Sequence, residues 1–203
     1  MTPIQEFTTE MKKLDFSSVS VSKYVYVLTE KSLYRLHLSG ESFQWKKINI
    51  IEERHGSLPP AVVVSGAIYV VGSGGGGEVR MSGSKAVSKY DPLLNQWKRL
   101  ANKELATIGS AVVAAKGCIY SVGGYAIGVG ATDRVERLDV APQTWIEIAP
   151  MREKRVAASA IECRGKIIVA GGLHSRLRSV EIFSPDVNQW TSLTPMKKGR
   201  WFF

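Results

Sequence analysis

The chain of 203 residues has little cysteine and no long apolar run. Its two cysteines, Cys118 and Cys163, lie far apart without a CxxC spacing, which excludes a disulfide framework and favours a reducing compartment. No apolar run approaches the length of a membrane span, and residues 1–13 lack the basic-then-apolar order of a signal peptide. We therefore expect a cytoplasmic protein without a membrane partner.

A helical pattern is also nearly missing. Helix-like spacing of apolar residues occurs only in the short, uncapped stretch from Ile4 to Leu14. Nineteen glycines instead indicate many tight turns, and an apolar content of 44% is enough for a core in a chain of this length. The net charge of +9 favours acidic partners. Because basic and aromatic residues do not interleave as in nucleic-acid modules, we expect a solvated basic surface rather than nucleic-acid binding.

Four of the five tryptophans recur at a regular interval. Trp45, Trp97, Trp145 and Trp190 are separated by 52, 48 and 45 residues. An aliphatic residue follows each of them three positions later: Ile48, Leu100, Ile148 and Leu193. Such a period is the signature of a repeat architecture.

One unit of the repeat contains four short strands. In the third unit, strands are predicted over 110–116, 118–123, 135–140 and 145–149, with a tight turn at Gly117. Short strands separated by frequent turn signals indicate an all-β fold. Four antiparallel strands that cannot bury both faces alone describe one blade of a β-propeller. We therefore predict that each tryptophan and its aliphatic companion pack against a neighbouring blade.

The repeat divides the whole chain. We predict an N-terminal segment, four blades and the start of a fifth, at residues 1–18, 19–55, 56–103, 104–151, 152–196 and 197–203. Because the tail after Pro195-Met196 copies the residues after Pro150-Met151, we expect the chain to stop inside the first strand of that fifth blade. An open series of four blades would leave unpaired backbone groups and an exposed apolar face at each end. Three explanations stay open: an incomplete product, closure by another chain through edge-mediated association, or a four-blade ring.

The repeated residues resemble the Kelch repeat. Its order of aliphatic-Tyr-x-x-Gly-Gly, Tyr-Asp-Pro, Asn-x-Trp and Pro-Met is carried by Ile119-Tyr120 with Gly123-Gly124, Tyr90-Asp91-Pro92, Asn95-Gln96-Trp97, Asn188-Gln189-Trp190, Pro150-Met151 and Pro195-Met196. The first unit departs from this order, with Thr29 and Glu30 in place of the glycine pair. The second has Gly72-Ser73 and Asn102-Lys103 in place of Gly-Gly and Pro-Met. The resemblance implies a segment of a Kelch-type β-propeller, a fold that usually closes with six blades.

The resemblance also implies a binding face. If the four strands of a blade alternate in direction, the loops between strands two and three and the connections between blades emerge on one face. In Kelch propellers that face commonly binds a peptide of a partner protein. An arginine after Pro-Met and the residue after the glycine pair often make the contact. The corresponding residues here are Arg155, Arg200, Tyr125 and Leu173, with Thr107 at the equivalent place in the third unit and Arg54 on the first connection. Arginine suits a carboxylate-bearing peptide because its planar fork donates two parallel hydrogen bonds.

The preferred prediction is a non-catalytic protein-interaction module. In animals, Kelch repeats frequently follow BTB and linker domains and select the substrate of a cullin-type ubiquitin ligase, while other members bind actin. A third alternative is a propeller enzyme of the copper oxidase or sugar epimerase type. His37, His55 and His174 lack metal-ligand spacing, no acid/base pair is identifiable, and Gly72–Gly77 lacks the following Gly-Lys-Ser/Thr of a phosphate loop. We therefore expect no catalysis, no metal and no cofactor.

Overall fold

The described chain consists of short strands and their connections. The computed structural model describes residues 17–21, 24–29, 32–38, 44–50, 55–56, 59–74, 83–173 and 177–201. Within these ranges there is no helix, so none that is long and apolar enough to cross a membrane. The helix candidate from Ile4 to Leu14 lies outside the described residues.

Sixteen of the strands form four antiparallel sheets, each with its strands in chain order. The first two sheets contain β1 (Ser17–Val21), β2 (Tyr24–Leu28), β3 (Ser32–His37), β4 (Trp45–Ile50), β5 (Ala61–Val64), β6 (Ala67–Val71), β7 (Val87–Asp91) and β8 (Gln96–Arg99). The other two contain β10 (Ala111–Ala115), β11 (Cys118–Val122), β14 (Val135–Asp139), β15 (Thr144–Ile148), β16 (Ser159–Cys163), β17 (Lys166–Ala170), β18 (Val180–Ser184) and β19 (Gln189–Leu193). The predicted four-stranded blades are thus confirmed.

A further, smaller sheet lies beside the third one. It has the order β13 (Gly130–Ala131), β12 (Tyr125–Ala126) and β9 (Thr107–Ile108). Strands β12 and β13 belong to the loop between β11 and β14, whereas β9 belongs to the connection that enters the third sheet. This small sheet therefore ties a loop to an inter-sheet connection.

Two-residue turns join the first and second strands of the later sheets. Lys116 and Gly117 both have positive φ, at 50° and 74°, between the paired residues Ala115 and Cys118. Two consecutive left-handed residues are the mark of a type I′ turn, whose twist matches that of the flanking strands. Positive φ recurs at the equivalent turns, Ser65-Gly66 and Arg164-Gly165.

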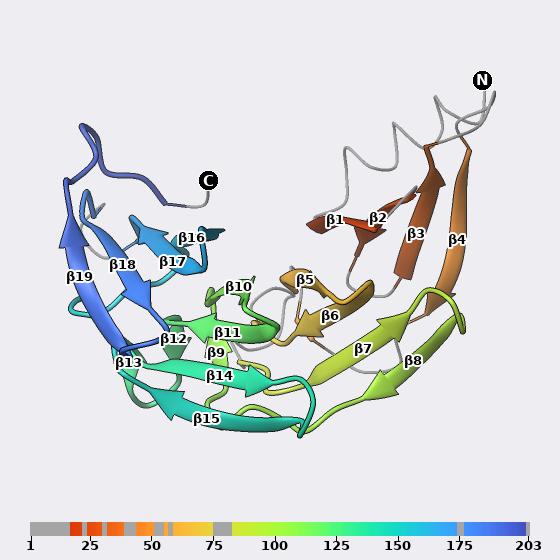
Figure 1. The fold of residues 1–203 in the computed structure, drawn as a ribbon, viewed down its shortest axis with the longest axis horizontal. Helices are drawn as coiled ribbons and strands as arrows, with labels where there is room; N and C mark the ends of the chain where they lie inside the picture. Colours follow the sequence, from red (N-terminus) through yellow and green to blue (C-terminus); the bar gives the residue numbers. More distant parts are fainter. Residues whose placement is uncertain are drawn as a thin grey trace.

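The four sheets stand side by side in an arc. Figure 1 shows β1, β5, β10 and β16 nearest the centre and β4, β8, β15 and β19 at the periphery. An apolar cluster fills each space between successive sheets, because a sheet with two apolar faces must bury both. This arrangement is that of consecutive propeller blades.

The recurring tryptophans occupy equivalent positions in the interfaces between sheets. Trp97, Trp145 and Trp190 each pack in the cluster shared with the preceding sheet. Two of the aliphatic companions, Leu100 and Ile148, pack in the cluster shared with the following sheet. The prediction that each pair lies against neighbouring blades is confirmed for these residues. Two residues three positions apart at the outer strand of a sheet therefore contact the sheets on both sides of it.

The tail differs from the prediction. Residues 197–201 contain no strand, and the equivalent residues 152–156 precede β16 rather than belong to it. The described tail therefore corresponds to an inter-blade connection and not to a first strand. After Pro150-Met151, the chain runs from the third sheet to the fourth without forming a strand, and β16 begins only at Ser159.

Candidate functional site

The loops between second and third strands lie against the connections between sheets. Backbone N–H groups at the second glycine of each pair, and at the residue after it, donate to carbonyl groups of these connections: Gly124 to Arg155 at 2.7 Å, Gly172 to Arg200 at 2.9 Å and Leu173 to Val156 at 2.7 Å. Tyr125 pairs with Ile108 in the small sheet. The sequence-based prediction that these segments share one face is met by these contacts. We call this face the rim face.

The glycine pair allows this close approach. Gly123 has a φ of 63°, and a Cβ atom there would stand 2.5 Å from the carbonyl oxygen of Arg155. Gly124 has a φ of 103°, and its Cβ would meet the Cβ of Thr107 at 2.9 Å. Only glycine combines this backbone conformation with the absence of a side chain. The Kelch-like glycines thus position the rim face rather than bind a ligand.

Large apolar side chains are exposed on the rim face. Their exposed fractions lie between 42% and 65%, and they come from the β12–β13 loop, the loop after Gly172 and the tail: Tyr125, Ile127, Val129, Leu173 and Trp201. These five residues are called the rim patch. Large apolar side chains left exposed on one face are candidates for contact with a partner. The sequence analysis named Tyr125 and Leu173 but missed Ile127 and Val129, which follow Tyr125 at intervals of two residues, the available signal.

Exposed basic residues lie on the same connections and in the loop between β17 and β18. They are Arg152, Lys154, Arg178, Lys197, Lys198 and Arg200. Arg178 donates from Nε to the carbonyl of Met196 at 2.8 Å, which fixes its stem beside the tail. The acidic residue Glu153 of the same connection accepts a hydrogen bond from Ser179. The rim face therefore combines apolar contact area with an excess of positive charge.

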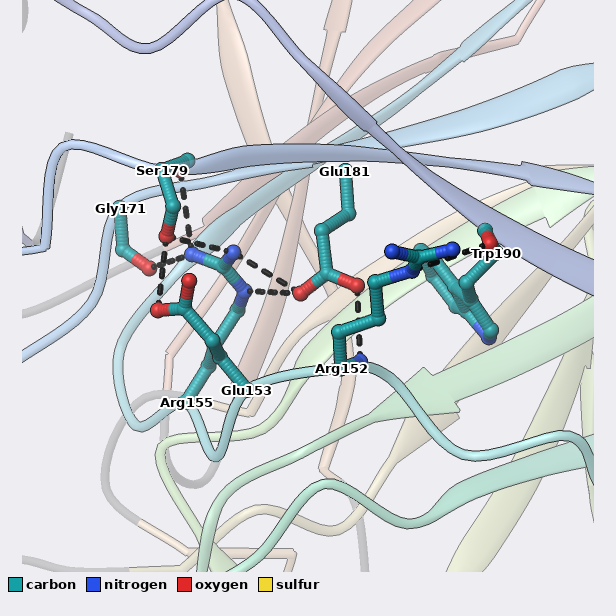
Figure 2. A network of polar contacts seen from close by, with 7 residues as sticks. All are labelled: Arg152, Glu153, Arg155, Gly171, Ser179, Glu181 and Trp190. Atoms are coloured by element: carbon teal, nitrogen blue, oxygen red, sulfur yellow. Dashed lines mark hydrogen bonds and ion pairs between the residues drawn. The ribbon is translucent and has the colours of Figure 1, made fainter.

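Arg155 is not part of this exposed set. It is only 1% exposed, and its guanidinium donates to Glu181 Oε1 from Nη2 at 2.9 Å, to the Gly171 carbonyl at 2.7 Å and to Ser179 Oγ at 2.8 Å. Figure 2 shows the guanidinium enclosed by these groups of the fourth sheet. The other oxygen of Glu181 accepts from the backbone N–H of Arg152 at 2.8 Å. This burial corrects the expectation that Arg155 contacts a partner: its side chain anchors the connection between the third and fourth sheets to the fourth sheet.

Thr107 is corrected in the same way. It is 1% exposed, and its Oγ1 accepts a hydrogen bond from Lys103 Nζ, which also lies 3.5 Å from Ser121 Oγ. Glu136, the counterpart of Glu181, accepts from the N–H groups of Glu104 and Leu105 at 2.6 and 3.1 Å. Lys103 occupies the place of Met151 and is equally buried. The third sheet thus takes its buried cation from Lys103, and the fourth from Arg155.

Burial of Lys103 has a measurable consequence. Desolvation lowers the pKa of Lys103 from 10.5 to about 8, against the opposing attraction of Glu136. In the unfolded chain Lys103 has its ordinary pKa of 10.5. Between about pH 8 and pH 10.5 the unfolded state therefore binds more protons than the folded state. Stability must therefore rise as the pH increases through this window.

We expect wild type to gain on the order of 3 kcal/mol in unfolding free energy relative to Lys103→Met between pH 7 and pH 10. Methionine is the residue at the equivalent position, Met151, and does not titrate. Urea unfolding of both proteins at each pH measures the difference, and the tyrosines contribute equally to both. Parallel stability profiles would show that Lys103 does not titrate in this window.

The remaining predicted residues divide between the rim and undescribed parts. Tyr125, Leu173 and Arg200 are exposed on the rim face, whereas Arg54 lies outside the described residues. His174 and residues 75–77 of the glycine run also lie outside them. In the ranges that the structure describes, no three His, Cys, Asp or Glu side chains are grouped as metal ligands would be. Cys118 and Cys163 are both free thiols.

Comparison with known proteins identifies the repeat. The model of the Kelch motif matches residues 106–152 and 154–197, which contain the third and fourth sheets. The chain carries Kelch repeats over these two segments. Its fold is also that of the solved structure of YjhT, with a TM-score of 0.78 at 15% identity, over 93% of this chain and 68% of that one.

Curated relatives extend the Kelch similarity along the chain. An F-box/kelch-repeat protein of Arabidopsis thaliana is 28% identical over 188 residues, which is 84% of this chain and 47% of that protein. Human Kelch-like protein 23 is 31% identical over 134 residues, which is 64% of this chain and 23% of that protein. The Kelch chain spans less than half the length of these relatives.

Proposed function

We propose that this Kelch chain is a non-catalytic protein-interaction module that binds a polypeptide through its rim face. The observation that carries the proposal is the rim patch: two loops and the tail of the rim face each expose large apolar side chains. A rigid set of sheets positions these connections, and loops on a rigid scaffold are the usual location of binding. Tyrosine, tryptophan and arginine, all present here, are the residues most enriched among those that dominate binding energy.

The charge of the rim face selects the partner. The connections and the β17–β18 loop on this face also expose lysines and arginines. A segment with alternating apolar and acidic residues would match both properties. The partner we propose is therefore an acidic, partly apolar peptide segment of another protein.

In the longer protein to which such a module would belong, we propose that it is the substrate-recognition part of a cullin-type ubiquitin ligase. The support is the similarity to an F-box/kelch-repeat protein and to Kelch-like proteins. Co-purification of a cullin with the full-length protein tests the assignment. The cullin should still co-purify when residues of the rim face are substituted. Loss of the substrate but not of the cullin on alteration of the rim face is the expected pattern.

Peptide binding to the chain itself tests the rim face directly. We expect a selected acidic-apolar peptide to bind about 10-fold or more weakly to Tyr125→Ala and to Arg200→Ala, because exposed aromatic and arginine side chains supply most interface energy. A peptide display library selected against wild type, followed by calorimetric titration, gives the affinities. Arg155→Met is unsuitable for this purpose, because its side chain is buried.

A matched control lies on the opposite face. Leu93, 96% exposed in the turn between β7 and β8, is the residue to replace with alanine. The Leu93→Ala variant should bind the peptide as tightly as wild type does. The unfolding midpoints of Leu93→Ala, Tyr125→Ala and Arg200→Ala should equal that of wild type. Selected peptides that bind equally to the rim variants, or that lose binding with Leu93→Ala, would remove the rim face as the site.

A further inference from the structure

A buried polar network joins the connection that enters the third sheet to the loop after β6. Its five side chains are at most 7% exposed: Ser73, Lys103, Thr107, Ser110 and Ser121. Lys103 Nζ donates to Thr107 Oγ1 and, at 3.5 Å, to Ser121 Oγ. Thr107 Oγ1 donates to Ser110 Oγ at 3.3 Å, and Ser110 donates to Ser73 Oγ from its backbone N–H at 2.9 Å and from its hydroxyl at 3.1 Å. Buried hydroxyl groups therefore connect the charged end of Lys103 to the second sheet.

Two members of this network stand where the second unit departs from the Kelch pattern. Ser73 replaces the second glycine of the pair, and Lys103 replaces the methionine of Pro-Met. The two residues are distant in sequence, and the structure joins them through Thr107 and Ser110. The equivalent residues of the third unit, Gly124 and Met151, carry neither a hydroxyl nor an amine. The two departures are therefore parts of one buried feature.

Thr107 connects this network to the rim face. It belongs to β9 and pairs with Ala126 of β12, while the next residue, Ile108, pairs with Tyr125. On its other side, Thr107 forms an isolated bridge with Ser84 of the loop between β6 and β7. The place of Thr107 therefore determines where β12 lies, and with it the exposed ring of Tyr125.

The small sheet is too short to hold this arrangement by itself. Each of β9, β12 and β13 contains two residues, and small groups of short strands need packing against other elements to be stable. Ile127 and Val129 of its loop are 59% and 65% exposed, so they bury little apolar surface. Segments of this kind open most easily. The order of the small sheet therefore depends on contacts that fix β9 from its buried side, among them the charge-assisted hydrogen bond from Lys103 to Thr107.

We propose that Lys103 is a positioning residue for the rim face, which through Thr107 holds β9 against β12 and so presents Tyr125, Ile127 and Val129 to the partner. This role rests on the proposed peptide binding. Lys103 is 1% exposed and does not reach the partner itself. A satisfied buried polar network favours one arrangement of the segments that it joins. Loss of the amine should therefore loosen the β12–β13 loop and weaken binding without removing a contact with the peptide.

Hydrogen exchange of the chain without peptide tests the positioning directly. Lys103→Met should raise the exchange rates of the amides in β9 and in residues 125–131 about 10-fold or more, the effect of one lost charge-assisted hydrogen bond, while the rates in β14 stay unchanged. Ser73→Ala removes the neutral end of the network and should raise the same rates less. Ser121→Ala is the matched control, because it removes the other contact of Lys103 and lies outside β9, so it should leave these rates unchanged.

Affinity for the selected acidic-apolar peptide gives a readout that a general loss of stability would not produce. Lys103→Met should bind this peptide several-fold more weakly than wild type. The double variant Lys103→Met, Tyr125→Ala should bind no more weakly than Tyr125→Ala alone, because the loop that Lys103 positions has already lost its aromatic contact. Combined with Arg200→Ala, which alters the tail rather than this loop, the two losses should multiply, as they do for independent sites.

The two measurements distinguish this proposal from that of peptide binding. If no peptide is selected, the proposed function fails, while the exchange rates still decide whether Lys103 holds β9 in place. Unchanged exchange rates in Lys103→Met, or equal increases in Ser121→Ala, would overturn the positioning role even where the peptide binds. Losses of affinity that multiply with Tyr125→Ala as they do with Arg200→Ala would overturn it as well.

Discussion

Arg155→Met should lower the free energy of unfolding by about 3–5 kcal/mol, the usual cost of removing one partner from a buried ion pair. The substitution keeps an apolar side chain of similar length but leaves the carboxylate of Glu181 buried without its cation. It also deprives the carbonyl of Gly171 and the hydroxyl of Ser179 of a donor. Urea unfolding followed by tryptophan fluorescence gives the difference.

The contrast with Arg200 makes this expectation specific. Arg200 stands at the same place after Pro-Met but is exposed, so Arg200→Met should change the unfolding free energy by no more than about 0.5 kcal/mol. The double variant Arg155→Met, Glu181→Leu should be more stable than Arg155→Met alone, because the unpaired charge is gone. A loss below about 1 kcal/mol for Arg155→Met would show that the ion pair does not anchor the connection to the fourth sheet.

Trp190→Ala should cost about 3–5 kcal/mol of unfolding free energy, as for other large aromatic side chains removed from a core. The indole is 6% exposed and lies between the third and fourth sheets, 5.0 Å from the ring of Phe183. Its Nε1 donates to the carbonyl of Ala149 at 2.8 Å, so the variant loses both apolar contact and a hydrogen bond across the interface. Denaturant unfolding again provides the measurement.

Trp201 is the matched control for this substitution. It is 43% exposed on the rim face, so Trp201→Ala should leave stability within about 0.5 kcal/mol of wild type. Trp190→Phe should fall between the alanine variant and wild type, because it keeps much of the ring. Equal losses for Trp190→Ala and Trp201→Ala would contradict the assignment of Trp190 to the inter-sheet core.

The strands and their grouping could be predicted from the sequence, because they depend on local patterns. The alternation over 135–140 and the turn at Gly117 correspond closely to β14 and to the β10–β11 turn. The spacing from each tryptophan to its aliphatic companion predicted contacts on two sides of a sheet. Such contacts follow from the alternation of side chains in a strand, and alternation is visible in sequence.

The placement of the candidate site could be predicted only in part. The loops after the glycine pairs do share a face with the connections, as the antiparallel order requires. Ile127, Val129 and Trp201 join Tyr125 and Leu173 there because β12 pairs with β9 and the tail pairs with Gly172. Neither pairing has a local sequence signal, since each joins segments that are distant along the chain.

The two arginines that follow Pro-Met show most clearly what depends on sequence and what depends on tertiary structure. Sequence alone determined that Arg155 and Arg200 follow Pro-Met at the same distance, and that the chain is a series of four-stranded β units. Only the tertiary structure decided that Arg155 is buried by Glu181, Ser179 and Gly171 of the next sheet, while Arg200 is exposed. Strand formation depends on neighbouring residues, whereas burial and charge pairing depend on which sheet packs beside them.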